Sequence, residues 1–151
     1  MQMTSIVWIV SFVGFWVVIT ALIAIAGGWH LLASMFPAPS GFAPDREHTS
    51  WFLRSLRLRR GNWLPSYYGG GFTVGTSAAG LYLAAPIPFR LFHAPILIPW
   101  RSIERCRRGS FLRSWVECEL PGPNVTIRVY GRFGGAVEFE WRQHSVGGPA
   151  A

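Results

Sequence analysis

Residues 93–108 read HAPILIPWRSIERCRR, an apolar run that breaks abruptly into positive charge. Residues 96–100 lack an alternation of apolar and polar side chains, which is typical of a strand that is covered on both faces. Pro95 and Pro99 cannot donate a ladder hydrogen bond, so each must lie at a strand end, an edge or a bulge. We therefore expect a buried strand that stops at Pro99 and Trp100, where the chain bends into the next strand near Ile103.

The arginine-rich half of this stretch predicts a β-hairpin. Residues 103–108 and 113–120 would pair around a turn at 109–112, and in that register Cys106 lies roughly opposite Cys118. Two cysteines do not indicate a disulfide framework, and a cytoplasmic location would keep both thiols reduced. We expect the thiols to pack as small apolar groups rather than to bind metal, since no further pair of ligands accompanies them.

Much of the chain after Thr49 alternates between apolar and polar residues with a period of two, as in residues 56–59, 72–76, 115–120, 125–130 and 137–141. Glycine, proline or asparagine separates these runs. A period of two places one face of a strand on a core and the other in water. We therefore predict an all-β domain of about seven or eight short antiparallel strands, a small split barrel or sandwich, with no useful amphipathic helix after residue 50.

The inward positions of these strands form the predicted core. Its members are Leu56, Leu58, Phe72, Val74, Leu81, Leu83, Ile98, Trp100, Val116, Cys118, Ile127, Val129, Val137 and Phe139. Trp100 is the largest of them, so its truncation should remove much of the stability of a small domain.

The N-terminal part of the chain has a different character. Residues 6–26, IVWIVSFVGFWVVITALIAIA, carry no charge and no proline, and at 1.5 Å per residue they would extend roughly 31 Å, the thickness of the hydrocarbon core of a bilayer. A cleaved signal peptide would need a positively charged start and a shorter apolar core, and no lysine or arginine precedes Arg46. We therefore predict one uncleaved transmembrane α-helix.

Charge predicts the orientation of that helix. The chain has 14 basic residues, all of them arginines, and all follow the apolar segment. The positive-inside rule then places the N-terminus outside and residues 46–151 in the cytoplasm, as in a single-pass protein of the inner (cytoplasmic) membrane. The rule counts charges within roughly 15–20 residues of the span, and only Arg46 falls inside that window.

Glycine and proline mark the boundaries between the parts of the chain. Two glycines follow the apolar helix, and Pro37, Pro39, Gly41 and Pro44 interrupt regular structure. We divide the chain into a transmembrane helix over 5–27, an interfacial segment and Pro/Gly-rich linker over 28–50, an all-β domain over 51–144 and a disordered tail over 145–151.

The block from 73 to 103 resembles a recurrent bacterial family of uncharacterised, often membrane-anchored proteins. The family pattern falls on Val74, Gly75, Gly80, Leu81, Tyr82, Leu83, Phe89, Arg90, His93, Pro95, Ile98, Pro99, Trp100 and Ile103, with Gly28-Trp29, Leu32-Ala33 and Tyr67-Tyr68 upstream. More distantly, residues 74–83 and 98–103 are similar to two strands of GRAM and bacterial PH-like domains. The first resemblance carries no assigned activity. The second implies a split β-barrel that binds lipid headgroups or other proteins.

Catalytic residues are not indicated. Histidines stand alone at positions 30, 48, 93 and 144, and the nucleophile, phosphate-loop and zinc-protease motifs are missing. We interpret His93, the one histidine inside the family-like block, as a hydrogen-bonded residue that holds a turn. The glutamates of 117–119 and 138–140 alternate with apolar residues and would face solvent. We expect no enzymatic activity, no cofactor and no metal site.

Arginines are the most informative surface feature. The candidate lipid- or partner-binding residues are Arg54, Arg57, Arg59, Arg60, Arg101, Arg105, Arg107, Arg108 and Arg113. They could simply form a solvated basic face, or they could attract anionic lipid, with roughly 1 kcal/mol per arginine near the surface. Nucleic acid is the runner-up for such charge, but it fits poorly with a membrane anchor.

Two function classes follow. The first is a membrane-anchored, non-catalytic binding module whose β-domain engages anionic lipid headgroups or a cytoplasmic protein. In it, the linker would let the basic hairpin end face the bilayer. The alternative is a small accessory subunit of a larger membrane complex, in which the small residues Gly14, Thr20, Ala24 and Gly28 would pack the span against a neighbour.

Overall fold

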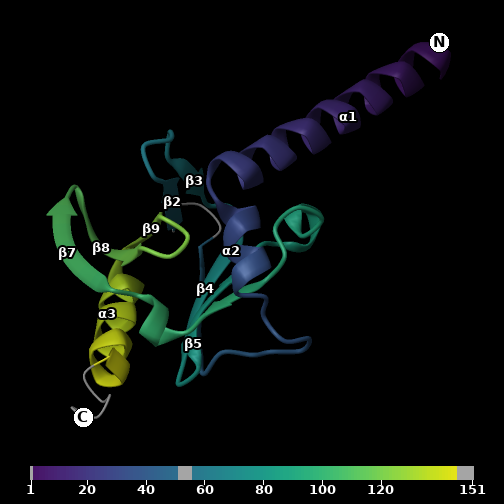
Figure 1. Ribbon diagram of the computed structural model, residues 1–151. Helices are drawn as coiled ribbons and strands as arrows, with labels where there is room; N and C mark the ends of the chain where they lie inside the picture. Colours follow the sequence, from purple (N-terminus) through teal and green to yellow (C-terminus); the bar gives the residue numbers. More distant parts are fainter. Residues whose placement is uncertain (1, 51–55, 146–151) are drawn as a thin grey trace.

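Helix α1 (Gln2–Ala26) is the first element of the computed structural model, which describes residues 2–50 and 56–145. Its segment Thr4–Ala26 has 23 residues and a mean hydropathy of 2.6, and it is long and apolar enough to cross a membrane. A signal sequence near an N-terminus would share these properties. The predicted helix is therefore present. It projects from the rest of the molecule and is a candidate membrane span (Figure 1).

Two glycines connect α1 to a short helix that belongs to the core. Gly28 has a φ of 82°, a left-handed conformation that favours glycine, and α2 (Trp29–Met35) starts directly after it. Trp29 and Leu32 are fully buried, and the Trp29 Nε1 donates a hydrogen bond to the Ala94 carbonyl at 2.9 Å. The predicted interfacial segment is thus a core helix, because its apolar side packs under the β-domain.

The β-domain contains two antiparallel sheets (Figure 1). The four-stranded sheet has the order β1 (Arg46–Ser50), β4 (Phe72–Ser77), β5 (Gly80–Ala84) and β6 (Ile96–Ile98). β1 lies within the predicted linker, so the irregular segment is shorter than the prolines and glycines suggest. The end of β6 comes so close to β5 that a Cβ on Gly80 would lie 2.1 Å from the Ile98 carbonyl oxygen, which is why glycine is needed there.

The second sheet contains the predicted hairpin. Its order is β3 (Ser66–Tyr68), β2 (Leu56–Arg60), β9 (Val125–Tyr130), β8 (Arg113–Leu120) and β7 (Arg105–Phe111). Cys106 pairs with Cys118, as the hairpin register predicts. The two cysteines form a disulfide with Cα atoms 4.2 Å apart, so the prediction of two free thiols is wrong. The register places both side chains directly opposite each other, within reach of a covalent bond.

The chain bends after β6 as the prolines predict. β6 ends at Ile98, and Pro99 precedes a short 3₁₀-helix, η2 (Trp100–Ser102). Trp100 is 3% exposed, and its Nε1 donates a 2.8 Å hydrogen bond to the Ser77 carbonyl at the end of β4. The bend is therefore tied to the core by the indole ring.

The C-terminal element is a helix, α3 (Arg132–Ser145), and not the predicted strand over 137–141. Phe133, Val137 and Trp141 are spaced by four residues, so they share one side of a helix and pack on the core. Phe139 lies off that side and is 57% exposed, which corrects its predicted burial. Short apolar runs fit both periods over a few residues, and here the longer helical stripe determines the structure.

A common core joins these parts. It contains residues of both sheets together with Ala24 of α1, Trp29 of α2 and Val137 of α3. All predicted core residues except Phe139 are buried. The result is the predicted all-β domain preceded by a long apolar helix, with α3 packed on β8 and β9. Six residues of the predicted tail, 146–151, lie outside the described residues.

Candidate functional site

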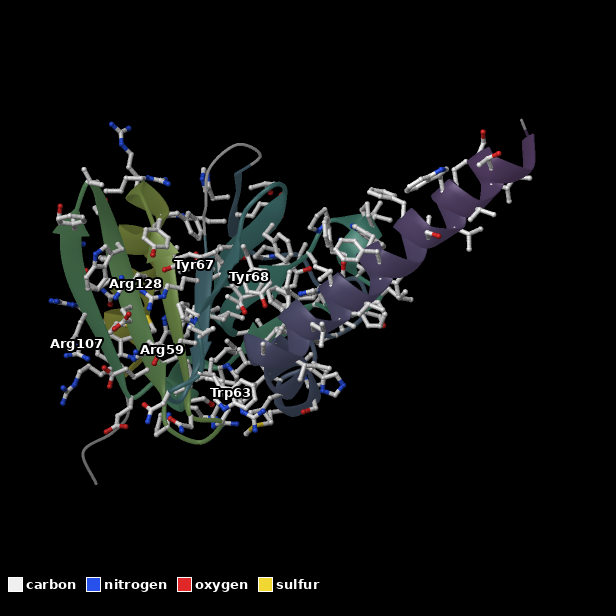
Figure 2. All side chains as sticks on the ribbon, turned by 90° about the horizontal axis from the view of Figure 1, so that it is seen from above. Arg59, Trp63, Tyr67, Tyr68, Arg107 and Arg128 are labelled. Carbon is white, nitrogen blue, oxygen red and sulfur yellow. A yellow bond between two sulfur atoms is a disulfide. The ribbon has the colours of Figure 1, made fainter. Side chains whose placement is uncertain are left out.

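The outward side chains of the five-stranded sheet form one polar surface. In β2, β8 and β9 buried residues alternate with more exposed ones, and α3 packs on the buried side. The outward cations are Arg57, Arg59, Arg105, Arg107, Arg113 and Arg128, and the outward aromatic residues are Tyr67, Trp115 and Tyr130. We call this surface the arginine face. Figure 2 shows Arg59, Tyr67, Arg107 and Arg128 spread across it.

One row of cross-strand neighbours dominates the arginine face. In order across the sheet, its members are Arg57, Arg128, Glu117 and Arg107. Arg57 therefore lies directly opposite Arg128, and like charges in that arrangement destabilise a sheet. Both guanidinium groups lie over aromatic rings: Arg57 is 5.5 Å from the centre of the Tyr67 ring, and Arg128 is 4.0 Å from that of Trp115. The negative ring faces attract the cations and so offset their repulsion.

Two glutamates neutralise part of the charge. The Nε and Nη2 of Arg128 both donate to Glu117 Oε2, at 2.8 and 2.6 Å. Burial alone would lower the pKa of Arg128, but the hydrogen bond and negative charge of Glu117, with a smaller contribution from Tyr130, raise that pKa above its ordinary value. Glu119 accepts a hydrogen bond from Arg107. Among the described residues no acidic group pairs with Arg59 or Arg105, so the face keeps a net positive charge.

The Trp115 ring has a fixed place because of a glycine. A Cβ on Gly109 would lie 2.1 Å from the Trp115 Cζ2, so the indole lies across the backbone of β7 where no side chain stands. An aromatic residue beside a strand glycine covers the exposed backbone and so stabilises the sheet. The absence of a side chain at Gly109 therefore makes room for the Trp115 ring on which Arg128 rests.

The other predicted arginines do not join this face. Arg101 lies in η2, and Arg60 ends β2 on the inward side, close to Gly28. Arg108 points towards α3, where its Nη2 lies 2.8 Å from Glu138 Oε2. Arg54 lies outside the described residues. The single basic cluster predicted for the hairpin is thus divided between two sides of the sheet.

The arginine face extends away from α1. In Figure 2, β3 with Tyr67 and Tyr68 lies near the helix, while β7 with Arg107 forms the opposite edge of the domain. The hairpin cannot swing towards α1 on the predicted linker, because Trp29 and Leu32 of α2 are buried in the core and Gly27 packs against the residues of β3. The basic hairpin therefore lies on the side of the domain remote from the candidate span.

Other chemistry has less support. Within residues 2–50 and 56–145, no group of three or more His, Cys, Asp or Glu side chains is placed to hold a metal ion. His93 is buried, and its Nδ1 lies 3.2 Å from the Phe89 carbonyl, in keeping with the predicted turn-holding role. No protein-family model matches the chain, and no curated protein matches it either. Function therefore has to be argued from the surfaces and cavities of the molecule itself.

Arg128 and the aromatic residues of the face were not predicted as site residues. Alternation along 125–130 places Arg128 outward, but only the register reveals that it lies between Arg57 and Glu117. Tyr67 and Trp115 carry no signal in the sequence, because their partners come from neighbouring strands. A search for arginines opposite aromatic residues in paired strands could have found them once the strand order was known.

Proposed function

We propose that this chain is a membrane-anchored, non-catalytic binding module whose arginine face binds an acidic, extended protein segment. The observation that carries the proposal is the row of arginines across the sheet: Arg57 and Arg128 rest on aromatic rings, and Arg107 ends the row at the edge of the domain remote from α1. Side chains that rest on rings are partly ordered before a partner arrives, so less conformational entropy is lost on binding. Their positive charge selects a negatively charged partner.

β7 supplies the backbone for such a segment. It is the last strand of its sheet, so one of its edges pairs with β8 and no strand of the described residues pairs with the other. An extended peptide can add to an open sheet edge through main-chain hydrogen bonds, with alternate side chains facing the same way as those of the edge strand. Acidic residues at alternate positions would then lie beside Arg105 and Arg107.

The position of the face favours a protein over the bilayer that holds α1. Attraction between charges is screened over about 8 Å at physiological ionic strength. Lipid headgroups around α1 would reach β3 first, whereas Arg107 lies on the far edge (Figure 2). The PH-like resemblance of the sequence allows either kind of ligand, and the geometry supports the protein partner.

The small residues of α1 and of the Gly28 turn that follows it are mostly buried, and this favours a binding module over an accessory subunit. Thr20 and Ala24 are 3% and 1% exposed, and a Cβ on Gly28 would contact Val125 and Arg60. Three of the four small residues therefore pack against the chain's own β-domain. Only Gly14, whose surroundings are open, remains for a neighbouring helix.

The test uses the full chain in nanodiscs of phosphatidylcholine. A labelled peptide in which glutamate and threonine alternate is titrated against it by fluorescence anisotropy, next to an isomer with all glutamates in one block. We expect saturable binding of the alternating peptide, weaker binding of the isomer, and a steady loss of affinity as salt rises. Replacement of Arg105 and Arg107 by glutamine should weaken binding roughly fivefold, since each lost exposed ion pair contributes about 0.5 kcal/mol.

A matched control removes the same charge elsewhere. Arg46→Gln with Arg101→Gln lowers the net charge equally at exposed positions of β1 and η2, and it should leave the affinity unchanged. Equal losses in both double variants would mean that only net charge matters and would refute the face as the site. Tighter binding of a single-stranded oligonucleotide, or competition by phosphatidylserine in the disc, would replace the acidic protein with nucleic acid or lipid.

The disulfide bears on the side of the membrane on which the domain lies. The charge asymmetry predicts the cytoplasm but depends on Arg46 alone, whereas structural disulfides persist in oxidising compartments. We therefore favour the oxidising side for the domain. Alkylation of intact cells with a maleimide that adds mass tests this: no shift before reduction supports the oxidising side, and free Cys106 and Cys118 thiols restore the cytoplasmic prediction.

A further inference from the structure

A cavity of about 210 Å³ lies where α1 meets the β-domain. Thr20 and Ile23 of α1 form one wall, and the aromatic rings of the domain form the others. The lining residues of the domain are Tyr67, Tyr68, Gly69, Phe72, Phe89 and His93. Phe72, Tyr68 and His93 pack edge to face or tilted against one another, which gives the cavity firm, mostly apolar walls.

His93 provides an unpartnered acceptor in this wall. It is 1% exposed, and its Nδ1 lies 3.2 Å from the Phe89 carbonyl. A carbonyl can only accept, so Nδ1 carries the hydrogen and Nε2 keeps its lone pair. Burial lowers the pKa of His93 more than the Phe89 hydrogen bond raises it, so the ring is neutral at pH 7. Nε2 has no hydrogen-bond partner among the described residues.

The hydroxyl groups nearby are already engaged. The Tyr68 hydroxyl donates to the Ile23 carbonyl at 3.2 Å, and the Thr20 hydroxyl donates to the Trp16 carbonyl at 2.7 Å. The Tyr68 bond joins the domain to α1, whereas the Thr20 bond lies within α1. Both hydroxyl groups are thus occupied, which leaves His93 Nε2 as the acceptor that a bound molecule could use. Buried polar atoms in native proteins are nearly always paired, so an unpaired one in a cavity wall points to a ligand or to water.

With α1 in a membrane, the cavity would lie near the bilayer interface. Thr20 precedes Ala26, the end of the candidate span, by six residues, or about 9 Å of helix. The loop around η1 (Ile87–Phe89) reaches further along α1, because the Phe89 ring packs on Trp16 with centroids 5.4 Å apart. Ile87 and Leu91 on this loop are 79% and 73% exposed. With α1 in a membrane, these side chains would meet lipid, so the natural source of an occupant is the bilayer.

We propose that this cavity binds the head of a neutral, hydroxyl-bearing lipid, whose hydroxyl donates a hydrogen bond to His93 Nε2. None of the lining side chains carries a charge at pH 7, so an anionic phosphate would be buried without a counter-charge. The cavity is smaller than the roughly 300–1,000 Å³ of sites for drug-sized ligands, so it takes a head and leaves the acyl chain along α1. Tyr67 belongs to both this cavity and the arginine face, but the ligand proposed for the cavity is of a different class.

The experiment compares two probes that differ in their hydroxyl groups. The full chain, labelled with ¹⁵N-histidine, is placed in phosphatidylcholine nanodiscs, and 1-oleoylglycerol or methyl oleate is added. We expect 1-oleoylglycerol to shift the His93 Nε2 resonance saturably, and methyl oleate to leave it unchanged. His93→Phe assigns the resonance and should lower the affinity for 1-oleoylglycerol at least about fivefold in a competition assay with a fluorescent analogue, since one buried hydrogen bond is lost.

A second variant tests the cavity without altering the histidine. Thr20→Phe places a ring in the cavity and should abolish the shift. Val18→Phe is the control, because the Val18 side chain is 56% exposed and does not line the cavity, and this variant should keep the shift. If both lipids shift the resonance equally, binding does not depend on the hydroxyl and the proposal is wrong. If neither shifts it and Nε2 already gives the signal of a hydrogen bond to water, the cavity holds water only and the proposal is also wrong. An unchanged response in Thr20→Phe would likewise overturn it. Peptide binding at the arginine face reports separately on the proposed function.

Discussion

Replacement of Trp100 by alanine should lower the unfolding free energy of the β-domain by roughly 3–5 kcal/mol. Trp100 is 3% exposed at the bend between β6 and β7, and its Nε1 donates a 2.8 Å hydrogen bond to the Ser77 carbonyl. Truncation removes the ring from the core, and about 1 kcal/mol of the loss comes from the carbonyl left without its donor. Small domains have about 5–15 kcal/mol in total, and a domain of this size loses about 4–8 °C of melting temperature per kcal/mol, so we expect a fall of at least about 12 °C.

Denaturation of the full chain in detergent, followed by near-ultraviolet circular dichroism, measures this change. Trp100→Phe keeps an aromatic ring in the core and removes the hydrogen bond, so it should lower the unfolding free energy by less than Trp100→Ala does, about 1–2 kcal/mol. Trp63→Ala is the matched control: Trp63 is 66% exposed, and its loss should stay within about 0.5 kcal/mol. If Trp100→Ala melts with the parent protein, the indole does not anchor the bend and the account of residues 93–108 is wrong.

Three further predictions concern other parts of the domain. Replacement of Cys106 and Cys118 by serine should lower the unfolding free energy by about 3 kcal/mol, because the bridge closes a loop with a sequence separation of 12, and the parent protein in reductant should match the variant in a guanidinium titration. Burial holds the pKa of His93 below its ordinary 6.5, so the unfolded chain binds the proton more readily than the folded chain; stability should be full well above pH 6.5 and fall as the pH drops below it, and His93→Phe should flatten this dependence. Gly109→Ala would force the Trp115 ring off β7, so the alternating acidic peptide should bind more weakly, while Gly122→Ala, where a Cβ meets only Met35 at 4.0 Å, should bind it normally.

Local patterns predicted the fold well wherever one element dictates its own structure. The two prolines indicate the end of β6, and period-two alternation indicates β2, β8 and β9, because each signal is contained in a few adjacent residues. α3 was mistaken for a strand because Val137, Phe139 and Trp141 alternate, and only contacts with the rest of the core show that Phe133 replaces Phe139 on the packed side.

The candidate site could be predicted only in part, since it depends on neighbours that are distant in the sequence. Outward positions for Arg57 and Arg107 follow from alternation, but their common row requires β9 to lie between β2 and β8. The cavity between α1 and the β-domain is still harder to predict from the sequence, because its walls come from α1, β3, β4 and the loop before β6. In the same way the cysteine register was predicted, whereas the bond between the two sulfur atoms was not.

Because the β-domain packs directly on the last turns of α1, the domain and the helix would tilt together if α1 crosses a membrane. The segment Thr4–Ala26 is about 35 Å long, some ångströms more than the roughly 30 Å hydrocarbon core of an average bilayer, and such an excess is absorbed by helix tilt. Ala24 and Gly27 are packed against the domain, so it must turn with the helix. A thicker membrane would bring α1 upright and rotate β7 through the aqueous layer above it. Bilayer thickness would then set the angle at which Arg105 and Arg107 are offered to a partner.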